Sequence, residues 1–205
     1  MTTRSLPLLL LAATLAACGD RASSPARAPA PPGTTRDSAG NLVDRTLLPQ
    51  DALRAFREGL PEVTALEGGS PTREALVRRF MTALETRDTA DLRRMVLSRA
   101  EFAWLWYETD PQSQPPYSLE PELYWFTLSG RSEQDVSKAL DELGGRPTGY
   151  LRHECAEPRM QGENRVYGYC RVYRAVGADT LQQALFGLIV ERGGSFKFVM
   201  YNNRL

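Results

Sequence analysis

The fold of this chain is decided by residues 165–201, RVYGYCRVYRAVGADTLQQALFGLIVERGGSFKFVMY. Alternating apolar and polar side chains predict strands over residues 165–175, 181–192 and 195–201. Between the last two strands, Gly193-Gly194 can supply the positive φ angles that a tight hairpin turn needs. On one face of the first strand lie Val166, Gly168, Cys170 and Val172. On its other face lie Tyr167, Tyr169, Arg171 and Tyr173. Consecutive strands with short links predict an antiparallel meander.

A further strand is predicted at residues 150–155, and a turn at Gly162-Glu163 would pair it with residues 165–175. Cys155 and Cys170 are symmetric about that turn. Pairing across the two strands would bring their Cα atoms to about 4.5–5.5 Å, which a disulfide can span. The bond would close a loop of about 15 residues, a constraint of roughly 3 kcal/mol. A reactive thiol or a metal-binding pair is the alternative interpretation.

Two amphipathic helices are predicted ahead of the strands, at residues 50–60 and 74–85, from apolar residues three and four positions apart. Ser70 is predicted to cap the second helix, with Pro71 in its first turn, where the missing N–H is not needed. The apolar face of this second helix consists of Leu76, Val77, Phe80, Met81 and Leu84.

Three further helix signals follow. Asp88 predicts the start of a short helix, and Ser98 with Glu101 has the spacing of a capping box that opens an aromatic-rich helix. A longer helix is predicted at residues 122–143, with a break at Gly130 as an open alternative. Helices at the front and strands at the back together favour an α+β fold, in which N-terminal helices cover one face of an antiparallel sheet.

Residues 74–96, EALVRRFMTALETRDTADLRRMV, resemble the opening of NTF2-like (SnoaL-like) domains. Those domains begin with an amphipathic helix, an ALE-x-x-D link and a second short helix. The resemblance extends over residues 71–205, and the opening and the terminal strands carry it. It implies a curved antiparallel sheet that wraps the helices into a cone.

The N-terminal residues predict export. Arg4 precedes an apolar run at residues 6–15, which is shorter than the ~20 residues of a membrane-spanning helix. Leu15-Ala16-Ala17-Cys18 resembles the lipobox of bacterial lipoproteins, in which the preceding peptide is removed and the cysteine carries the lipid. The resemblance implies a membrane anchor on Cys18. Gly19 after the cysteine implies sorting to the outer membrane, facing the periplasm.

This interpretation divides the chain into three parts. Residues 1–17 are the signal peptide, residues 18–45 are a tether, and residues 46–205 are a single α+β domain. The tether is rich in Pro and Ala and has few large apolar side chains, so it is expected to stay disordered and extended.

Charge and composition narrow the possible functions. The 205 residues include 25 Lys and Arg against 25 Asp and Glu, without a basic stripe, so nucleic acid is not an expected partner. The single histidine, His153, and the expected disulfide leave no usual set of zinc ligands. We therefore expect neither a metal nor a cofactor, and the sequence makes no prediction of oligomeric state.

Aromatic side chains are the remaining functional signal. They are more numerous than a strict core requires, and aromatic walls with a few polar groups are typical of small-molecule pockets. Trp104 and Trp106 lie two positions apart, so on a helix they would face different surfaces. Core packing is the competing interpretation for each aromatic residue. The candidates for a ligand pocket are Trp104, Tyr107, Tyr124, Trp125, Tyr167 and Tyr169.

Two hypotheses about function follow. The first is a non-enzymatic envelope lipoprotein whose domain binds a partner protein or a small hydrophobic ligand. The alternative is an NTF2-like enzyme of the isomerase, dehydratase or hydrolase type. Its catalytic candidate is His153, which would act as a general base beside a carboxylate. A histidine on the surface of a strand is the competing interpretation of that residue.

Overall fold

The computed structural model describes residues 34–36, 40–44 and 49–205. The chain divides into two units between Thr46 and Leu47. The predicted signal peptide and Cys18 lie outside the described residues. In the first unit, β1 (Thr34–Arg36) pairs antiparallel with β2 (Leu42–Asp44), within the segment predicted to be an extended tether.

The helices of the second unit follow the order expected from the sequence. They are α1 (Pro49–Arg57), α2 (Arg73–Thr86), α3 (Thr89–Met95), α4 (Arg99–Glu101) and α5 (Pro121–Leu143). A π-helical turn, η1 (Phe102–Trp106), continues α4, and the short turns η2 (Tyr107–Thr109) and η3 (Pro111–Ser113) follow it.

Two of the helix caps predicted from the sequence are observed, and a third is not. The Asp88 side chain caps α3, and Ser98 and Glu101 form the predicted capping box. The predicted cap at Ser70 is wrong. Thr72 caps α2 instead, accepting from the Ala75 N–H at 3.0 Å, because the Ser70 backbone is paired with a strand.

The α5 helix is not broken at Gly130, and it continues for 23 residues. Glycine costs a helix interior only about 1 kcal/mol, and the residues on either side hold α5 in place. Leu128 and Ser132 are both buried against the rest of the unit.

Seven strands follow the helices: β3 (Tyr150–Glu154), β4 (Arg159–Gln161), β5 (Asn164–Tyr167), β6 (Arg171–Val176), β7 (Asp179–Gln183), β8 (Ile189–Arg192) and β9 (Ser195–Phe198). They form two antiparallel sheets, with strand orders β3-β6-β7 and β4-β5-β8-β9. The predicted strands 165–175 and 181–192 are therefore each divided, with one half in each sheet. Each predicted strand still pairs antiparallel with the next predicted strand, so the predicted pairing is confirmed, as is the α+β class.

One register runs through both sheets. Glu154 faces Arg171 in the first sheet, and Arg159 faces Val166 in the second. Along the chain, Glu154 and Arg159 are separated by as many residues as Val166 and Arg171, so no extra residue is inserted between the two sheets. The segments β3–β4 and β5–β6 are therefore the two arms of one hairpin that passes from sheet to sheet. The predicted faces are also observed, because Val166 and Val172 are buried while Tyr169 is exposed.

The predicted disulfide between Cys155 and Cys170 is confirmed. It lies where the hairpin leaves the first sheet, one position beyond the pair of Glu154 with Arg171. The two cysteines are 15 residues apart in the sequence, so chain entropy alone assigns the bond roughly 3 kcal/mol. It holds the arms together where the ladder of backbone hydrogen bonds is interrupted.

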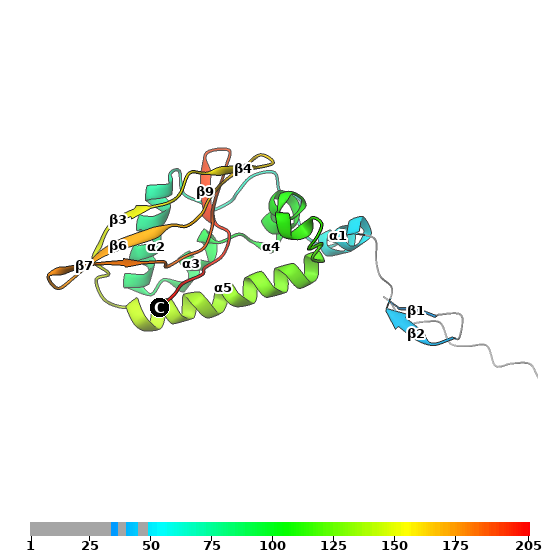
Figure 1. Ribbon diagram of the computed structural model, residues 1–205, viewed down its shortest axis with the longest axis horizontal. Helices are drawn as coiled ribbons and strands as arrows, with labels where there is room; N and C mark the ends of the chain where they lie inside the picture. The colour runs from blue at the N-terminus through cyan, green and yellow to red at the C-terminus, as the bar shows by residue number, and fades with distance from the viewer. Residues whose placement is uncertain (1–33, 37–39, 45–48) are drawn as a thin grey trace, which may run out of the picture. The chain divides into compact units, whose positions relative to one another are not determined.

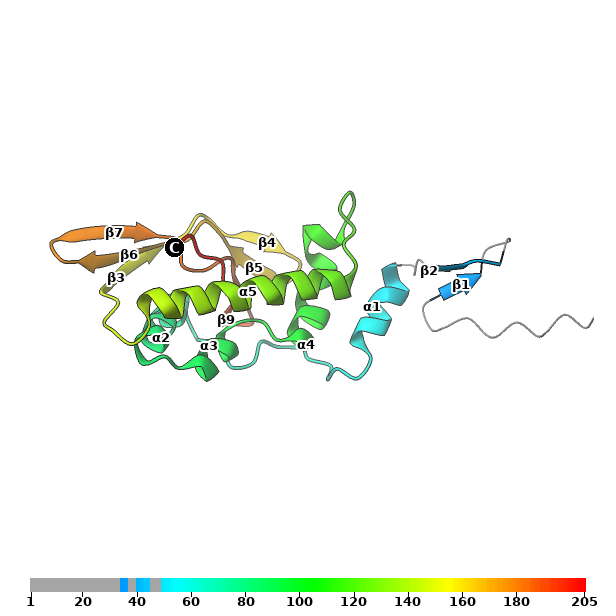
Figure 2. The same ribbon diagram turned by 90° about the horizontal axis from the view of Figure 1, so that it is seen from below.

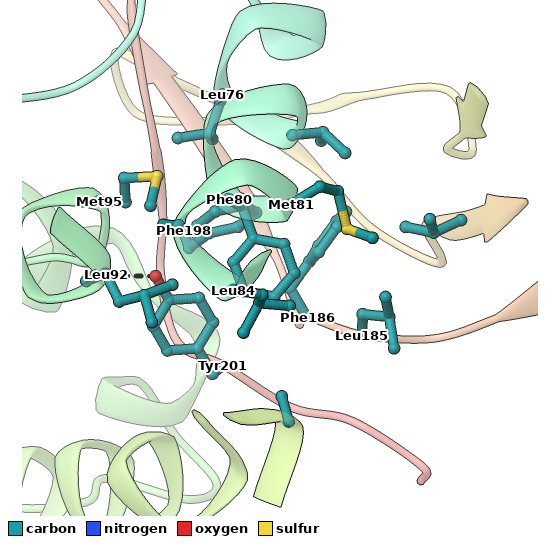
Figure 3. Close-up of a cluster of buried hydrophobic side chains, with 14 of the residues drawn as sticks. Leu76, Phe80, Met81, Leu84, Leu92, Met95, Leu185, Phe186, Phe198 and Tyr201 are labelled. Carbon is teal, nitrogen blue, oxygen red and sulfur yellow. Dashed lines mark hydrogen bonds between the residues drawn. The ribbon is translucent and has the colours of Figure 1, made fainter. Parts of the chain in front are cut away.

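The helices and strands enclose a core of phenylalanine and leucine side chains, which we call the first cluster (Figure 3). Phe80 on α2 is at its centre, with ring centroids at 5.7 Å from Phe186 and 5.4 Å from both Phe198 and Tyr201. The β3-β6-β7 sheet lies on one side of the unit and α2 and α3 on the other, with α5 running lengthwise (Figures 1 and 2).

A second cluster fills the space among α1, η1 and the start of α5. Its centre is Phe102, whose ring lies 5.8 Å from Phe56 and 5.2 Å from both Tyr124 and Trp125. The α5 helix contributes to both clusters, and the surface between its two ends is hollowed.

Candidate functional site: a groove between α3 and α5

One wall of a surface groove is formed by α3 and the two residues after Val96. The lining positions on α3 recur three and four residues apart, which places them on one face of the helix. Asp91 holds α3 against α2 through two hydrogen bonds from Arg79, at 2.6 and 2.8 Å, and these bonds keep the pKa of Asp91 below its ordinary value. The wall consists of Thr89, Leu92, Arg93, Val96, Leu97 and Ser98.

The opposite wall is one face of α5 over four turns. Its first and last lining residues, Trp125 and Leu140, are 15 positions apart, so the wall is about 22 Å long at about 1.5 Å per residue. It carries both apolar and hydroxyl side chains. The wall consists of Trp125, Leu128, Ser129, Ser132, Glu133, Val136, Ser137 and Leu140.

Two long-range contacts fix how the walls face each other. Arg99, just beyond the Ser98 end of the first wall, bonds Glu122 in the first turn of α5 at 2.6 Å. At the other end, Arg87, just before α3, donates to the carbonyl of Leu140 at 2.8 Å. The two helices therefore run antiparallel, with Trp125 near Ser98.

Tyr201 forms part of the floor and joins the two walls. Its hydroxyl donates to the Leu92 carbonyl at 2.8 Å (Figure 3), and its backbone N–H donates to the Ser132 hydroxyl at 2.9 Å. Burial raises the pKa of Tyr201, so its phenol stays protonated at every physiological pH.

The groove has a volume of about 450 Å³. This lies within the range of about 300–1,000 Å³ that is usual for small-molecule sites. Its most buried apolar side chains include Leu92, Leu97 and Leu128, and its exposed residues carry hydroxyl and charged groups. The arrangement suits a ligand with an apolar body and a polar edge.

Ser132 is the one deeply buried small hydroxyl among the described groove residues, with 5% of its surface exposed. Its oxygen accepts from Tyr201, and a hydroxyl can also donate one hydrogen. No acceptor for that hydrogen is found in the part of the chain that the structure describes. Ser132 can therefore donate to a ligand in the groove.

His153 lies outside the groove, in a polar cluster between β3 and the start of α2. Its Nε2 accepts from Arg73 at 3.1 Å, and a guanidinium can only donate, so the hydrogen of the neutral ring is on Nδ1. Nδ1 is 2.9 Å from the Tyr150 hydroxyl and 3.1 Å from a Glu74 carboxylate oxygen. Both ring nitrogens therefore have partners within the protein.

The electrostatics of this cluster favour a neutral histidine. Burial, and then the positive charge of Arg73, lower the pKa of His153. Burial and the hydrogen bond to Glu74 raise the pKa of Tyr150 to about 12. The only predicted catalytic candidate thus lies in a closed hydrogen-bonded network, with no nitrogen left for a substrate proton.

Of the predicted pocket residues, the structure places Trp125 in the groove wall. Tyr107 is buried in the second cluster and donates to the Leu119 carbonyl at 2.7 Å. Tyr124 packs beside it, and burial raises its pKa. Trp104 lies under the guanidinium of Arg57, which is 4.1 Å from its ring centroid.

The remaining two tyrosines lie elsewhere. Tyr167 packs between the guanidinium of Arg73, at 4.8 Å, and the ring of Phe196, at 6.1 Å. Tyr169 has 85% of its surface exposed and a φ of 51°, and it borders a shallow depression of about 200 Å³ beside the disulfide. The six predicted aromatic residues do not converge on one pocket.

Most groove residues were missed in the sequence because each wall is a helix face of ordinary amphipathic spacing. The signal that marks the site is the serines on α5. Ser129, Ser132 and Ser137 interleave with Leu128 and Val136 on a face that pure core packing would fill with apolar side chains.

Among residues 34–36, 40–44 and 49–205, no three His, Cys, Asp or Glu side chains are placed to hold a metal ion. Over the same ranges, none of the helices has the length and apolar character needed to cross a bilayer.

Comparisons with family models, with curated protein sequences and with solved structures find no match to this chain.

Proposed function

We propose that this chain is an exported lipoprotein whose folded unit binds a small hydrophobic or amphipathic molecule in the groove between α3 and α5. The observation that carries the proposal is the groove itself, with its volume of about 450 Å³, apolar floor and hydroxyl-bearing rim. Binding requires no catalytic group, and the one histidine is engaged within its own cluster.

Export and anchoring are supported by the lipobox-like sequence ending in Cys18 and by the disulfide between Cys155 and Cys170. Disulfides persist in oxidising compartments such as the periplasm. The proposed location is the outer membrane, with the folded unit in the periplasm. Metabolic labelling with radioactive palmitate should mark the wild-type chain and leave Cys18→Ser unlabelled, and a labelled Cys18→Ser chain would contradict the anchor.

For the fold, we propose an NTF2-like cone. Its support is the continuous register of the hairpin through both sheets, which makes them two parts of one bent surface beside α2 and α3. An experimental structure in which the two sheets stack face to face, rather than bend into one another, would contradict the cone.

The binding function is tested by titration with N-phenyl-1-naphthylamine, a neutral dye whose fluorescence rises in apolar surroundings. Val136→Trp places a bulky ring in the groove wall and is expected to weaken dye binding by roughly tenfold or more, since it fills apolar volume that the dye would occupy. Leu181→Trp is the matched control, because Leu181 is exposed on β7, away from the groove. Equal binding by the wild type and both variants would overturn the proposal.

A partner protein in the envelope is the second candidate. This candidate is favoured by two exposed apolar residues on α5. Leu123 has 56% of its surface exposed, and Phe126 has 74%. A photo-crosslinking residue at position 126 should then capture one defined neighbour in intact cells. The same residue at position 181 is the control, and equal products at both positions would contradict a specific surface.

A further inference from the structure

The charges that line the groove constrain which ligand it accepts. Its lining contains one cation, Arg93 on α3, and one anion, Glu133 on α5. Both are exposed at the rim, and within the described part of the chain neither is in an ion pair. The neighbouring Arg94 differs, because it bonds Asp91 at 2.9 Å.

A singly charged ligand head would meet both signs at this rim. An anion attracted by Arg93 is repelled by Glu133 on the opposite wall, and a cation experiences the reverse. A charged head that entered the groove as far as the buried Ser132 would also lose its hydration, which is far more costly for an ion than for a neutral polar group. The rim therefore disfavours both kinds of charged head.

Hydroxyl groups that line the groove can form hydrogen bonds with a neutral polar head. Of those on α5, the Ser129 hydroxyl already donates to the Trp125 carbonyl at 2.8 Å. Ser132 keeps a free hydrogen in the buried middle of the wall. A carbonyl or ether oxygen that reaches Ser132 would satisfy that donor.

The shape of the groove suits a long ligand. Its α5 wall extends about 22 Å. Apolar residues recur along this wall at Leu128, Val136 and Leu140. A straight acyl chain whose carbonyl lies at Ser132 could contact Val136 and Leu140.

We infer that the ligand of this groove is an elongated amphiphile without net charge, such as an acylglycerol, whose carbonyl oxygen accepts a hydrogen bond from Ser132. This inference rests on the proposed binding function and specifies its ligand class.

Three probes with the same ten-carbon chain test the charge preference: monodecanoylglycerol, decanoate and decyltrimethylammonium. Each displaces N-phenyl-1-naphthylamine from the wild-type protein in a competition titration. Monodecanoylglycerol should compete at a concentration about tenfold lower than either ion, because it avoids the cost of ion desolvation. Equal or stronger competition by decanoate would overturn the inference.

Charge reversal on either wall sharpens this test. Glu133→Arg leaves two cations at the rim and should improve competition by decanoate by roughly tenfold. Arg93→Glu should improve competition by decyltrimethylammonium to a similar degree. Arg94→Glu is the matched control, because Arg94 does not line the groove, and it should leave all three probes unchanged. If the two rim variants behaved like this control, the charge argument would be refuted.

The hydrogen bond to Ser132 has its own test. Ser132→Ala should weaken competition by monodecanoylglycerol roughly fivefold, the effect of one hydrogen bond, while apolar binding of the dye persists. Thr127→Ala is the control, since Thr127 is on α5 but does not line the groove, and its hydroxyl is bonded to the Leu123 carbonyl at 2.9 Å. Failure of the dye to bind any variant or the wild type would refute the proposed function, whereas dye binding without a preference for the neutral probe would refute only the ligand class.

Discussion

The two hydrophobic clusters of this unit are built in different ways. The first cluster packs the regular face of α2 against strands, and its ring contacts converge on Phe80. The second cluster surrounds the π-helical turn η1, whose carbonyls are taken by side chains. Arg57 donates to Ala103 O at 2.8 Å, and Asn164 donates to Leu105 O at 2.7 Å. The regular backbone of α2 satisfies its own hydrogen bonds, whereas the irregular backbone of η1 depends on side chains for some of them.

The largest effect is expected when the first cluster loses its central ring. Phe80→Ala should lower the free energy of unfolding by about 4 kcal/mol, because Phe80 is fully buried and its neighbours cannot close the cavity. In the second cluster, Trp104→Phe should cost less than about 1.5 kcal/mol, since Trp104 is only half-buried. Urea denaturation measures both. A smaller loss for Phe80→Ala than for Trp104→Phe would reverse the comparison.

Features that depend on spacing within the chain could be predicted from the sequence, as the regular helix of the first cluster illustrates. The face of α2, the capping box at Ser98 and the disulfide depend on spacing within the chain, and all three were predicted correctly. The apolar alternation of residues 165–175 was also correct. It continues unchanged through the point where the strand leaves one sheet for the other, so alternation alone carries no signal of that division.

The missed features depend on contacts between distant segments. Ser70 does not cap α2, because its backbone exchanges hydrogen bonds with Phe196, at 2.9 and 2.8 Å. The groove was missed for a related reason: α3 and α5 each show an ordinary helix face, and only their antiparallel packing leaves a hollow between them. Tertiary pairing of this kind overrides local preference.

A buried ion pair joins the two clusters and provides the second prediction. Lys197 and Glu101 are 2.7 Å apart, with 4% and 2% of their side chains exposed. Lys197→Met should cost about 3 kcal/mol, because the Glu101 carboxylate would remain buried without its cation. Urea denaturation at neutral pH measures the loss.

The double variant Lys197→Met/Glu101→Gln distinguishes an ion pair from independent contacts. The introduced amide carries no charge, so no unpaired charge stays buried, and its one oxygen can accept from one of the backbone N–H groups of Glu67 and Ser98, which now bond different oxygens of Glu101 at 2.7 Å each. The double variant should therefore lose less stability than the two single variants combined. Strictly additive losses would show that the two charges act separately.

The smallest effect is expected outside both clusters, at His153. Its pKa is lowered in the folded protein by burial and by Arg73, whereas in the unfolded chain it is near 6.5. The unfolded state thus binds the proton more readily, and the contribution of His153 to stability is present above pH 6.5 and is lost as the pH falls toward its folded pKa. Each unit of the pKa difference can change stability by at most about 1.4 kcal/mol.

His153→Gln isolates this contribution, because glutamine does not titrate and the rest of the sequence is the same in both proteins. Arg73 and Arg78 oppose protonation of His153, and Glu74 favours it. Urea denaturation at pH 7.5 and pH 5.5 should show a larger acid-induced loss for the wild type than for the variant. If the wild type instead gained stability relative to the variant on acidification, Glu74 would outweigh burial and the two arginines, and the cluster would favour a charged histidine.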